Sequence, residues 1–403
     1  VTITIEDQSV PYDGQQPETP ANEAEKNWTI SSGRLADGEQ PQVLGVTLQL
    51  AQGSPDAGEY ALYGQWSNKN YAVEFQGSWQ QAGEYQKKAG TYTVKKAKVT
   101  LQISTNMEGV YGDALQIDAL TLTPIEGGLV NGEMAEQAIR PYYDFKVVDQ
   151  DGGKLEVSQT PYPIQPAPKA DAAAECNYEV TFRDGAYWVN PRPVTITILD
   201  QESPYGCEVA PGVAEKEHYT VEYTGGTGKQ AIIAGDALGI QLTTQASASQ
   251  PAGSYALQAQ KTGADAENYA VTFKGQTPWA GSVQDGTPAN EAFGTYTIGK
   301  AALEIAFEQH DRQTFALAFT STYTETVKLK NQDSGKEDLD AAAEGIQVEY
   351  SLDEANTTGG IASIESSTGR LTLTGTGKVR VIAKVTDGGN NYRAGSETWY
   401  EMM

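Results

Sequence analysis

A six-residue strand pattern occurs three times in this chain and constrains its fold more than any other feature. The copies lie at 70–75 (NYAVEF), 177–182 (NYEVTF) and 268–273 (NYAVTF). Each copy alternates Tyr, Val and Phe with small or polar residues, which is typical of a strand with one buried face. A strand that recurs in this way predicts that one structural unit has been duplicated in tandem.

Each unit also opens with an alternating strand that leads into a tyrosine turn. The opening strands are expected at 1–5, 98–103 and 194–198. Glycine supplies the positive φ that such turns often require, and Asp caps them through its side chain. The turn residues are Tyr12, Asp13 and Gly14 in the first unit, Tyr111 and Gly112 in the second, and Tyr205 and Gly206 in the third.

Two further motifs recur in the first and third units. An Ala-Gly-x-Tyr turn and strand lies at 56–62 and 251–257, and a Gly-Thr-Tyr closing strand lies at 90–94 and 294–298. The second unit lacks the Ala-Gly-x-Tyr strand and has a Pro-rich segment, 160–169, which we interpret as a loop. Because the next unit starts almost directly after each closing strand, we expect a stiff end-to-end array.

From Ala302 onwards the pattern changes to a fourth β-domain, with alternating Leu303, Ile305 and Phe307 at its start. The predicted fold class is therefore all-β, a tandem array of small immunoglobulin-like β-sandwich domains that forms an elongated rod. The expected domains are 1–97, 98–193, 194–301 and 302–403.

In combination these motifs resemble the YDG/MBG-type repeat modules of large bacterial surface adhesins. The first domain resembles the YDG/MBG type, the second a divergent YGX/MBG type and the third the YGX/MBG type. The last domain resembles a bacterial immunoglobulin-like domain of group 2, with 363–371 (SIESSTGRL) as its recognisable core. The resemblance implies a cell-surface or secreted location and a stalk or adhesion role. It supplies no catalytic residues.

Charge and hydropathy exclude several classes of partner. The chain has 28 basic and 53 acidic residues, a net charge of −25, which argues against binding nucleic acid or anionic lipid through a broad surface. No stretch approaches the roughly 20 apolar residues of a membrane-spanning helix. We therefore expect no nucleic acid partner, no membrane insertion by this segment, and a monomer.

The acidic residues raise the question of calcium, and the two cysteines that of a disulfide. The best calcium candidate, 149–152 (DQDG), lacks the Glu that an EF-hand loop needs at its twelfth position, where Thr160 stands, so we interpret it as a hairpin turn. Cys176 and Cys207 fall in successive units and are expected to be free thiols. The chain has no signal peptide and begins on a strand, so we expect it to be a fragment of a longer protein.

Nothing in the sequence favours catalysis. The two histidines, His218 and His310, lie in different units and in no metal-binding or nucleophile-activating motif. With so many carboxylates, a glycosidase-type pair cannot be chosen from sequence. We therefore expect no enzyme, no catalytic or metal-binding residues and no cofactor.

Three tryptophans are the best candidates for ligand binding. Trp79, Trp188 and Trp279 each follow the repeated strand of one unit. A tryptophan exposed there could stack on a sugar ring, whereas a buried one would cap the sandwich core or pack against a neighbouring unit.

Asparagines precede Tyr in all three repeated strands: Asn70 before Tyr71, Asn177 before Tyr178, and Asn268 before Tyr269. We expect these asparagines to bond to nearby backbone in turns. A covalent Lys–Asn cross-link involving Lys96 or Lys300 is a second possibility, but solvated lysines at unit ends are the plainer interpretation.

Two functions remain open, and an enzymatic role survives only as ancillary modules beside a catalytic domain outside this sequence. In the first, the chain is a non-enzymatic stalk that spaces and presents a distal domain on a bacterial surface. In the second, the units themselves bind host or matrix glycans or proteins. Buried tryptophans would favour the stalk, and an exposed tryptophan beside polar groups would favour the binder.

Overall fold

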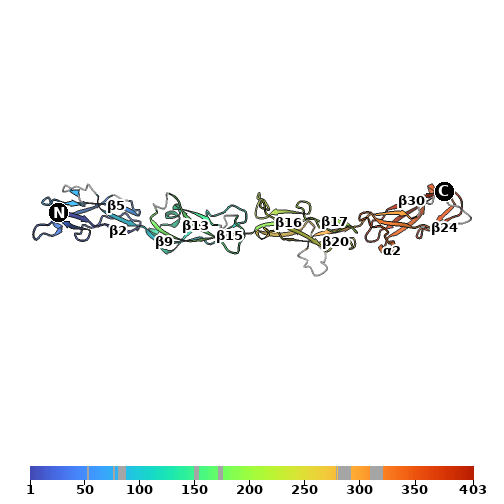
Figure 1. Cartoon of the computed structure of the whole chain (residues 1–403), viewed down its shortest axis with the longest axis horizontal. Coiled ribbons are helices and arrows are strands. Elements are labelled where there is room, and N and C mark those ends of the chain that lie inside the picture. The colour runs from blue at the N-terminus through green and yellow to red at the C-terminus, as the bar shows by residue number, and fades with distance from the viewer. Residues whose placement is uncertain are drawn as a thin grey trace. The chain divides into compact units, whose positions relative to one another are not determined.

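The computed structural model describes residues 1–51, 54–75, 88–148, 154–170, 176–277, 279, 292–308 and 321–403, and the backbone alone at 78–79. The chain forms two compact units, Val1–Asn190 and Pro191–Met403. Strands dominate both units (Figure 1), and the two α-helices found in these residues, α1 (Ala135–Ala138) and α2 (Ala341–Glu344), have four residues each. The prediction of an all-β tandem array of small immunoglobulin-like sandwiches is confirmed. The rod-like arrangement and the domain limits stay predictions.

The first eight strands form what we call the first module, in two four-stranded sheets. The sheet orders are β3-β1-β6-β7 and β2-β8-β5-β4. The short 3-10 helix η1 (Pro41–Leu44) precedes β4. The strands are β1 (Thr2–Ile5), β2 (Gln8–Pro11), β3 (Trp28–Ser32), β4 (Thr47–Leu50), β5 (Gly58–Gln65), β6 (Glu74–Phe75), β7 (Ser78–Trp79) and β8 (Lys88–Lys95).

The second module completes the first unit with sheets ordered β11-β9-β14 and β10-β15-β13-β12. Between β11 and β12 lie η2 (Val130–Gly132), α1 and η3 (Arg140–Tyr142). The strands are β9 (Ala97–Ile103), β10 (Met107–Val110), β11 (Leu122–Gly127), β12 (Tyr143–Val147), β13 (Tyr162–Pro168), β14 (Tyr178–Arg183) and β15 (Gly185–Asn190).

The third module repeats this topology in sheets ordered β18-β16-β21 and β17-β22-β20-β19. The 3-10 helix η4 (Ala266–Asn268) immediately precedes β21. The strands are β16 (Arg192–Ile198), β17 (Gln201–Pro204), β18 (Tyr219–Tyr223), β19 (Ile240–Thr244), β20 (Gly253–Lys261), β21 (Tyr269–Gly275) and β22 (Ala292–Gly299).

The fourth module has sheets β23-β25, β24-β28-β27 and β26-β29-β30, in which every ladder is antiparallel. It also contains α2 and η6 (Glu354–Asn356). The strands are β23 (Leu303–Phe307), β24 (Ser321–Thr324), β25 (Val327–Asn331), β26 (Gln347–Leu352), β27 (Ala362–Ile364), β28 (Arg370–Leu373), β29 (Val379–Asp387) and β30 (Glu397–Met402).

One arrangement distinguishes the first three modules from the fourth. Their opening strand pairs in parallel with the repeated strand, as β1–β6, β9–β14 and β16–β21. The next strand then joins the opposite sheet, parallel to the closing strand, as β2–β8, β10–β15 and β17–β22. The opening segment therefore links the two sheets of each module, and its alternating β-branched residues fill the space between them. In β16, for example, Val194, Ile196 and Ile198 are all buried.

The repeated strand is shorter in the first module than the sequence predicts. Only Glu74 and Phe75 of 70–75 pair with β1, whereas Tyr178 begins a ladder with Ala97 in the second module. The register explains the difference. Thr2 pairs with Glu74 as Thr100 pairs with Thr181, so the partner of Tyr71 would stand ahead of Val1.

The interpretation of 160–169 as a loop is wrong, because Tyr162–Pro168 forms β13 between β12 and β15. The staggered ladders make its prolines tolerable. β15 pairs with residues 162–164 and β12 with residues 164–168, so the two ladders overlap only at Ile164. Pro166 and Pro168 therefore each have one paired side, and the missing N–H can fall on the other. Pro163 pairs with Ala186, and its carbonyl also accepts the N–H of Val148 at 2.9 Å.

Close packing across the first module yields a stability prediction. A Cβ on Gly64 in β5 would lie 2.5 Å from Cε1 of Phe75 and 2.8 Å from Cδ1 of Ile5. We expect Gly64→Ala to destabilise the module by about 1–3 kcal/mol through overpacking. Gly58→Ala, in the same strand with no atom within 4 Å of the added carbon, is the matched control. Denaturant unfolding followed by fluorescence measures both, and equal effects would contradict this account.

Candidate functional site

The first and second modules meet at two buried tyrosines that share one carboxylate. Tyr12 donates to Oε1 of Glu133 at 2.7 Å, and Tyr178 donates to Oε2 of the same residue at 2.6 Å. The rings pack edge to face, with centroids 5.6 Å apart and an interplanar angle of 78°. Tyr12 follows β2 in the first module, whereas Glu133 and Tyr178 belong to the second. The contact therefore joins one module to the next.

Asn177 forms a second set of bonds across the same boundary. Its Oδ1 accepts the backbone N–H of Ala57 at 2.8 Å, and its Nδ2 donates to Oδ1 of Asp56 at 2.9 Å. Asp56 and Ala57 belong to the Ala-Gly turn of the first module. The expectation that this asparagine bonds to nearby backbone is therefore wrong, because its side chain caps a turn about 120 residues earlier.

Asn131 completes the contact. Its Nδ2 donates to the backbone oxygen of Gly14 at 3.2 Å. A Cβ on Gly14 would approach that nitrogen to 2.9 Å, and the glycine has a φ of 72°, so the turn requires glycine on both counts. We call Tyr12, Asn131, Glu133, Asn177 and Tyr178 the first junction cluster.

The third and fourth modules meet through an equivalent group, which we call the second junction cluster: Tyr205, Asn331, Asn391 and Tyr392. The two tyrosine rings again pack edge to face, with centroids 5.4 Å apart and an angle of 85°. Asn391 Oδ1 accepts the N–H of Ala252 at 3.0 Å, and Asn331 Nδ2 donates to the backbone oxygen of Tyr205 at 2.9 Å. The turn glycine, Gly206, approaches Asn331 as Gly14 approaches Asn131.

Backbone bonds at the two boundaries also correspond. Ala97 donates to the carbonyl of Asn177 at 3.1 Å, and Ala301 donates to the carbonyl of Asn391 at 2.9 Å. Lys300 Nζ donates to the carbonyl of Gly389 at 2.7 Å, so this lysine contacts the fourth module rather than an asparagine of its own. The short Lys-Ala linker is thus part of each boundary.

A four-residue turn supports the repeated tyrosine in each of the first three modules. The first residue donates its backbone N–H to the tyrosine oxygen and the fourth accepts from the tyrosine hydroxyl. The pairs are Ala36 and Glu39 for Tyr71, Val130 and Glu133 for Tyr178, and Ile233 and Asp236 for Tyr269. The third residue is a glycine with positive φ in all three turns, namely Gly38, Gly132 and Gly235. The sequence reasoning above missed this recurrent Gly-acid pair.

The remaining motif residues are mostly turn residues or buried side chains. Asp13 accepts the N–H of Gln15 at 2.9 Å, as a turn-capping aspartate should. Gly112 and Gly206 have φ of 75° and 83°. Tyr111 and Asn268 are both buried, whereas Asn70 is exposed.

The structure places the three candidate tryptophans differently. Trp188 lies on β15 with 40% of its surface exposed. Glu108 is its partner in the adjacent strand, and Asn190 donates to that carboxylate at 3.1 Å. Trp279 is half-buried, and its indole N–H is shielded from solvent and bonds to none of the described residues. The side chain of Trp79 lies outside the described residues.

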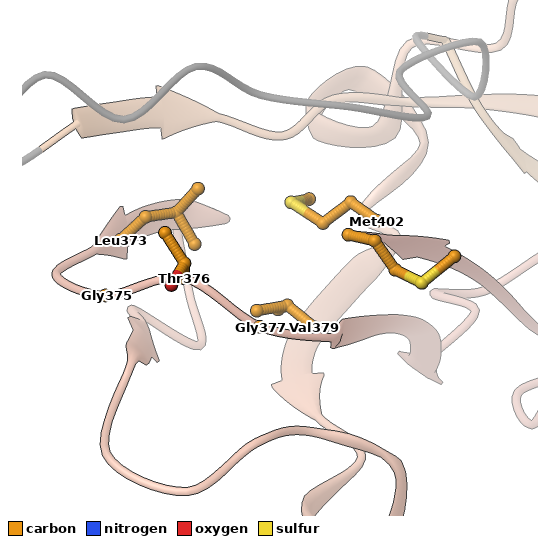
Figure 2. A pocket seen from close by; sticks show the side chains of 7 residues that line it. Leu373, Gly375, Thr376, Gly377, Val379 and Met402 are labelled. Atoms are coloured by element: carbon orange, nitrogen blue, oxygen red, sulfur yellow. The ribbon is translucent and has the colours of Figure 1, made fainter.

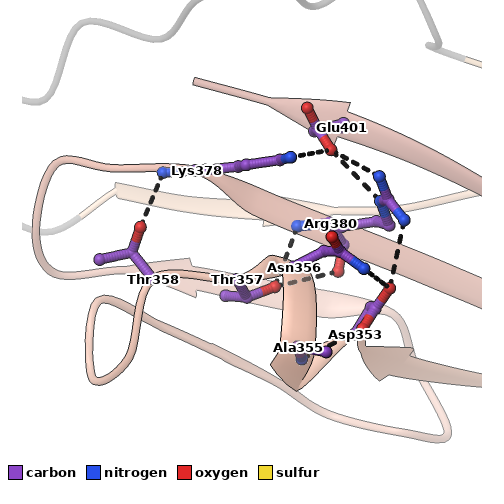
Figure 3. Close-up of polar contacts among 8 residues, drawn as sticks. All are labelled: Asp353, Ala355, Asn356, Thr357, Thr358, Lys378, Arg380 and Glu401. Carbon is purple, nitrogen blue, oxygen red and sulfur yellow. Dashed lines mark hydrogen bonds and ion pairs between the residues drawn. The ribbon is translucent and has the colours of Figure 1, made fainter.

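A second exposed aromatic group, which the sequence reasoning did not find, lies on the fourth module. The guanidinium of Arg380 stacks 4.2 Å from the ring of Trp399. Figure 3 shows the same guanidinium between Glu401, at 2.9 Å, and Asp353, at 3.3 Å. Lys378 also binds Glu401, at 2.8 Å. Because Asp353 caps η6, this network holds η6 against β29 and β30.

Hydrogen bonding lowers the pKa of both carboxylates in that network. The amide of Asn356 is the main cause at Asp353, and Lys378 followed by Arg380 at Glu401. Both groups are therefore charged at neutral pH, and the network weakens when acid protonates them.

No metal-binding cluster occurs among the described residues. No group of three or more His, Cys, Asp or Glu side chains in them could hold a metal ion. His218 Nδ1 accepts the backbone N–H of Ala214 at 3.0 Å, which is a turn contact. Both cysteines are free. His310 and the segment 149–152 lie outside the described residues.

The pocket in Figure 2 lies at one end of the fourth module. Its apolar side chains are those of Leu373, Val379, Met402 and Met403, and Thr376 also lines it. Its volume is about 50 Å³, whereas small-molecule sites commonly have several hundred. The pocket is therefore a packing gap at the end of the sandwich rather than a ligand site.

Comparisons with known proteins give no family. No family model matches the chain, and no curated protein matches it. In the described part of the chain, no helix is long and apolar enough to cross a membrane. The specific resemblance to YDG/MBG modules therefore stays a prediction.

Several solved structures align with the chain at low similarity. Drosophila N-cadherin EC1-4 is 9% identical over 100% of this chain and 98% of its own, with a TM-score of 0.23. Three N-terminal domains of the bacteriophage RB49 outer capsid protein Hoc are 11% identical over 76% and 98%, with a TM-score of 0.22. A SusE-like surface-located polysaccharide-binding protein of Bacteroides thetaiotaomicron is 11% identical over 89% and 54%, with a TM-score of 0.19. Similarity of this size identifies no ligand and no site.

The first junction cluster predicts a specific alkaline titration. Burial, followed by the bond to Glu133, raises the pKa of Tyr12 from 10.0 to about 12. The raised pKa favours the neutral phenol in the folded chain, so its stabilising effect is complete below about pH 10 and is lost as pH rises towards 12. We expect the ultraviolet titration of wild type minus Tyr12→Phe to show one tyrosine ionising near pH 12. A difference centred near pH 10 would contradict the buried contact.

Proposed function

We propose that this chain is a non-enzymatic spacer of a bacterial cell-surface or secreted protein, which holds a distal functional domain at a fixed distance. The observation that carries the proposal is the pair of junction clusters. Each one joins successive modules through an edge-to-face aromatic pair and side-chain bonds to backbone, which a flexible linker would not provide. The spacer acts as a monomer and requires no cofactor, metal or nucleic acid.

The physical requirement on a spacer is that successive modules keep a fixed relative orientation. Apolar contact alone is non-directional, whereas hydrogen bonds impose distances and angles. At the first boundary, Tyr12, Asn131 and Asn177 supply such bonds from both sides of the contact. Removing them should leave the covalent linker intact and allow the modules to rotate.

The width of an inter-module distance distribution tests this proposal. Spin labels at Gln49 in β4 and Lys146 in β12, both exposed, report on the first boundary in a Cys207→Ser background. We expect a single narrow distance in the otherwise unchanged chain and a broad distribution in Tyr12→Ala/Asn177→Ala. The matched control is Tyr205→Ala/Asn391→Ala, which should leave this distance unchanged. A broad distribution before any junction substitution would contradict the spacer proposal.

A second candidate function is glycan binding, which the exposed ring of Trp188 favours. Its flat face offers apolar area, and the bonded pair of Glu108 and Asn190 supplies polar groups beside it. The spacer proposal gives no role to this exposure.

A glycan array separates the two candidates. The spacer proposal predicts no specific binding by the full chain. If binding occurs, the glycan proposal predicts its loss in Trp188→Ala and its retention in Trp399→Ala, the control at another exposed tryptophan. Equal loss in both variants would argue against a site at Trp188.

A further inference from the structure

The first module carries the receiving half of a junction cluster. Tyr71 donates to Glu39 and accepts the N–H of Ala36 at 2.9 Å, as Tyr178 does with Glu133 and Val130. Asn70 precedes Tyr71 as Asn177 precedes Tyr178. The groups that bond to Tyr12 and Ala57 in the second module therefore have counterparts here, whereas Asp37 stands in the place of Asn131.

The accessibility of these residues differs from that of their equivalents. Tyr178 and Tyr392, which receive a tyrosine from the preceding module, are 3% and 1% exposed. Tyr71 is only half-buried and Asn70 is exposed. Glu39 uses Oε2 for Tyr71, and among the described residues no hydrogen bond reaches its Oε1, the oxygen that takes Tyr12 on Glu133.

We propose that the surface formed by Glu39, Asn70 and Tyr71 binds the tyrosine-turn end of another module of this repeat type, attached in line ahead of β1. The partner's tyrosine would donate to Oε1 of Glu39 and pack against the ring of Tyr71. The amide of the partner's Ala-Gly turn would donate to Oδ1 of Asn70. The inference goes beyond the spacer proposal and does not depend on it, since a binding array needs the same contacts.

Backbone register favours an in-line module over a separate molecule. At both boundaries an alanine follows the closing segment of the earlier module. The backbone N–H of this alanine donates to an asparagine carbonyl of the next module, from Ala97 to Asn177 and from Ala301 to Asn391. Because successive modules belong to one continuous chain, that residue lies at the start of the next module's opening strand. In the second module, Ala97 is the first residue of β9 and pairs with Tyr178. A separate copy would have to supply the same strand from a free end.

The test adds one module to the full chain. A copy of residues 1–98 is joined directly to Val1, because Val1 occupies the register position of Val99. The added copy carries Tyr71→Phe, so nitration at this position can come only from Tyr71 of the original first module. Nitration of Tyr71 is then followed by mass spectrometry in the native and extended chains.

We expect about tenfold slower nitration of Tyr71 in the extended chain. An added aromatic pair would favour the docked, shielded state of the ring by about this factor. Tyr12→Ala in the added copy should restore the native rate. An unchanged rate in a folded extended chain, or protection that survives Tyr12→Ala, would overturn the proposal. Protection that rises with concentration in the native chain would show docking of a second copy and overturn the in-line assignment.

Circular dichroism shows whether the added module folds. If it does not, a copy of residues 194–302 replaces it, because Ala301 occupies the register position of Ala97 and brings Tyr205 as the donor. The same nitration outcomes then decide the proposal.

Discussion

The bonding of two buried phenol groups is the constraint on which the boundary between the first and second modules depends. Tyr12 and Tyr178 are shielded from water when their modules meet, and a buried hydroxyl without a partner costs about 1–3 kcal/mol. Glu133 satisfies both hydroxyls through its two oxygens. A small displacement of either module would leave at least one phenol unpaired. The carboxylate therefore converts a non-directional aromatic contact into one with a preferred geometry.

The second boundary shows which parts of this arrangement are essential. The described ladders of the fourth module are all antiparallel and its sequence pattern differs, yet it presents Asn391 and Tyr392 in equivalent places. Asn331 again lies against the turn glycine of the preceding module. No carboxylate bridges Tyr205 and Tyr392 among the described bonds. The asparagine caps and the aromatic pair are thus common to both boundaries, whereas the bridging acid belongs to the first.

Sequence reasoning predicts the local features well and the boundaries poorly, for a physical reason. Alternation and glycine position depend on a few adjacent residues, so β16, β22 and the turns at Gly14 and Gly206 could be recognised directly. The partner of Tyr12 lies 121 residues away in sequence, and no local pattern relates the two. β13 was missed because its prolines argue against a strand, and only the staggered ladders on its two sides make them acceptable.

The chemistry of the boundaries also suits a chain that carries a net charge of −25. Modules of like charge repel, and salt screens this repulsion beyond about 8 Å at physiological ionic strength. Exposed ion pairs would be screened by the same salt and contribute little. The bond from Tyr12 to Glu133 and the bonds from the N–H groups of Ala57 and Ala252 to asparagine side chains rely instead on close contact. Module contacts built in this way should persist over a wide range of salt concentrations, which is what a chain with a fixed module geometry requires.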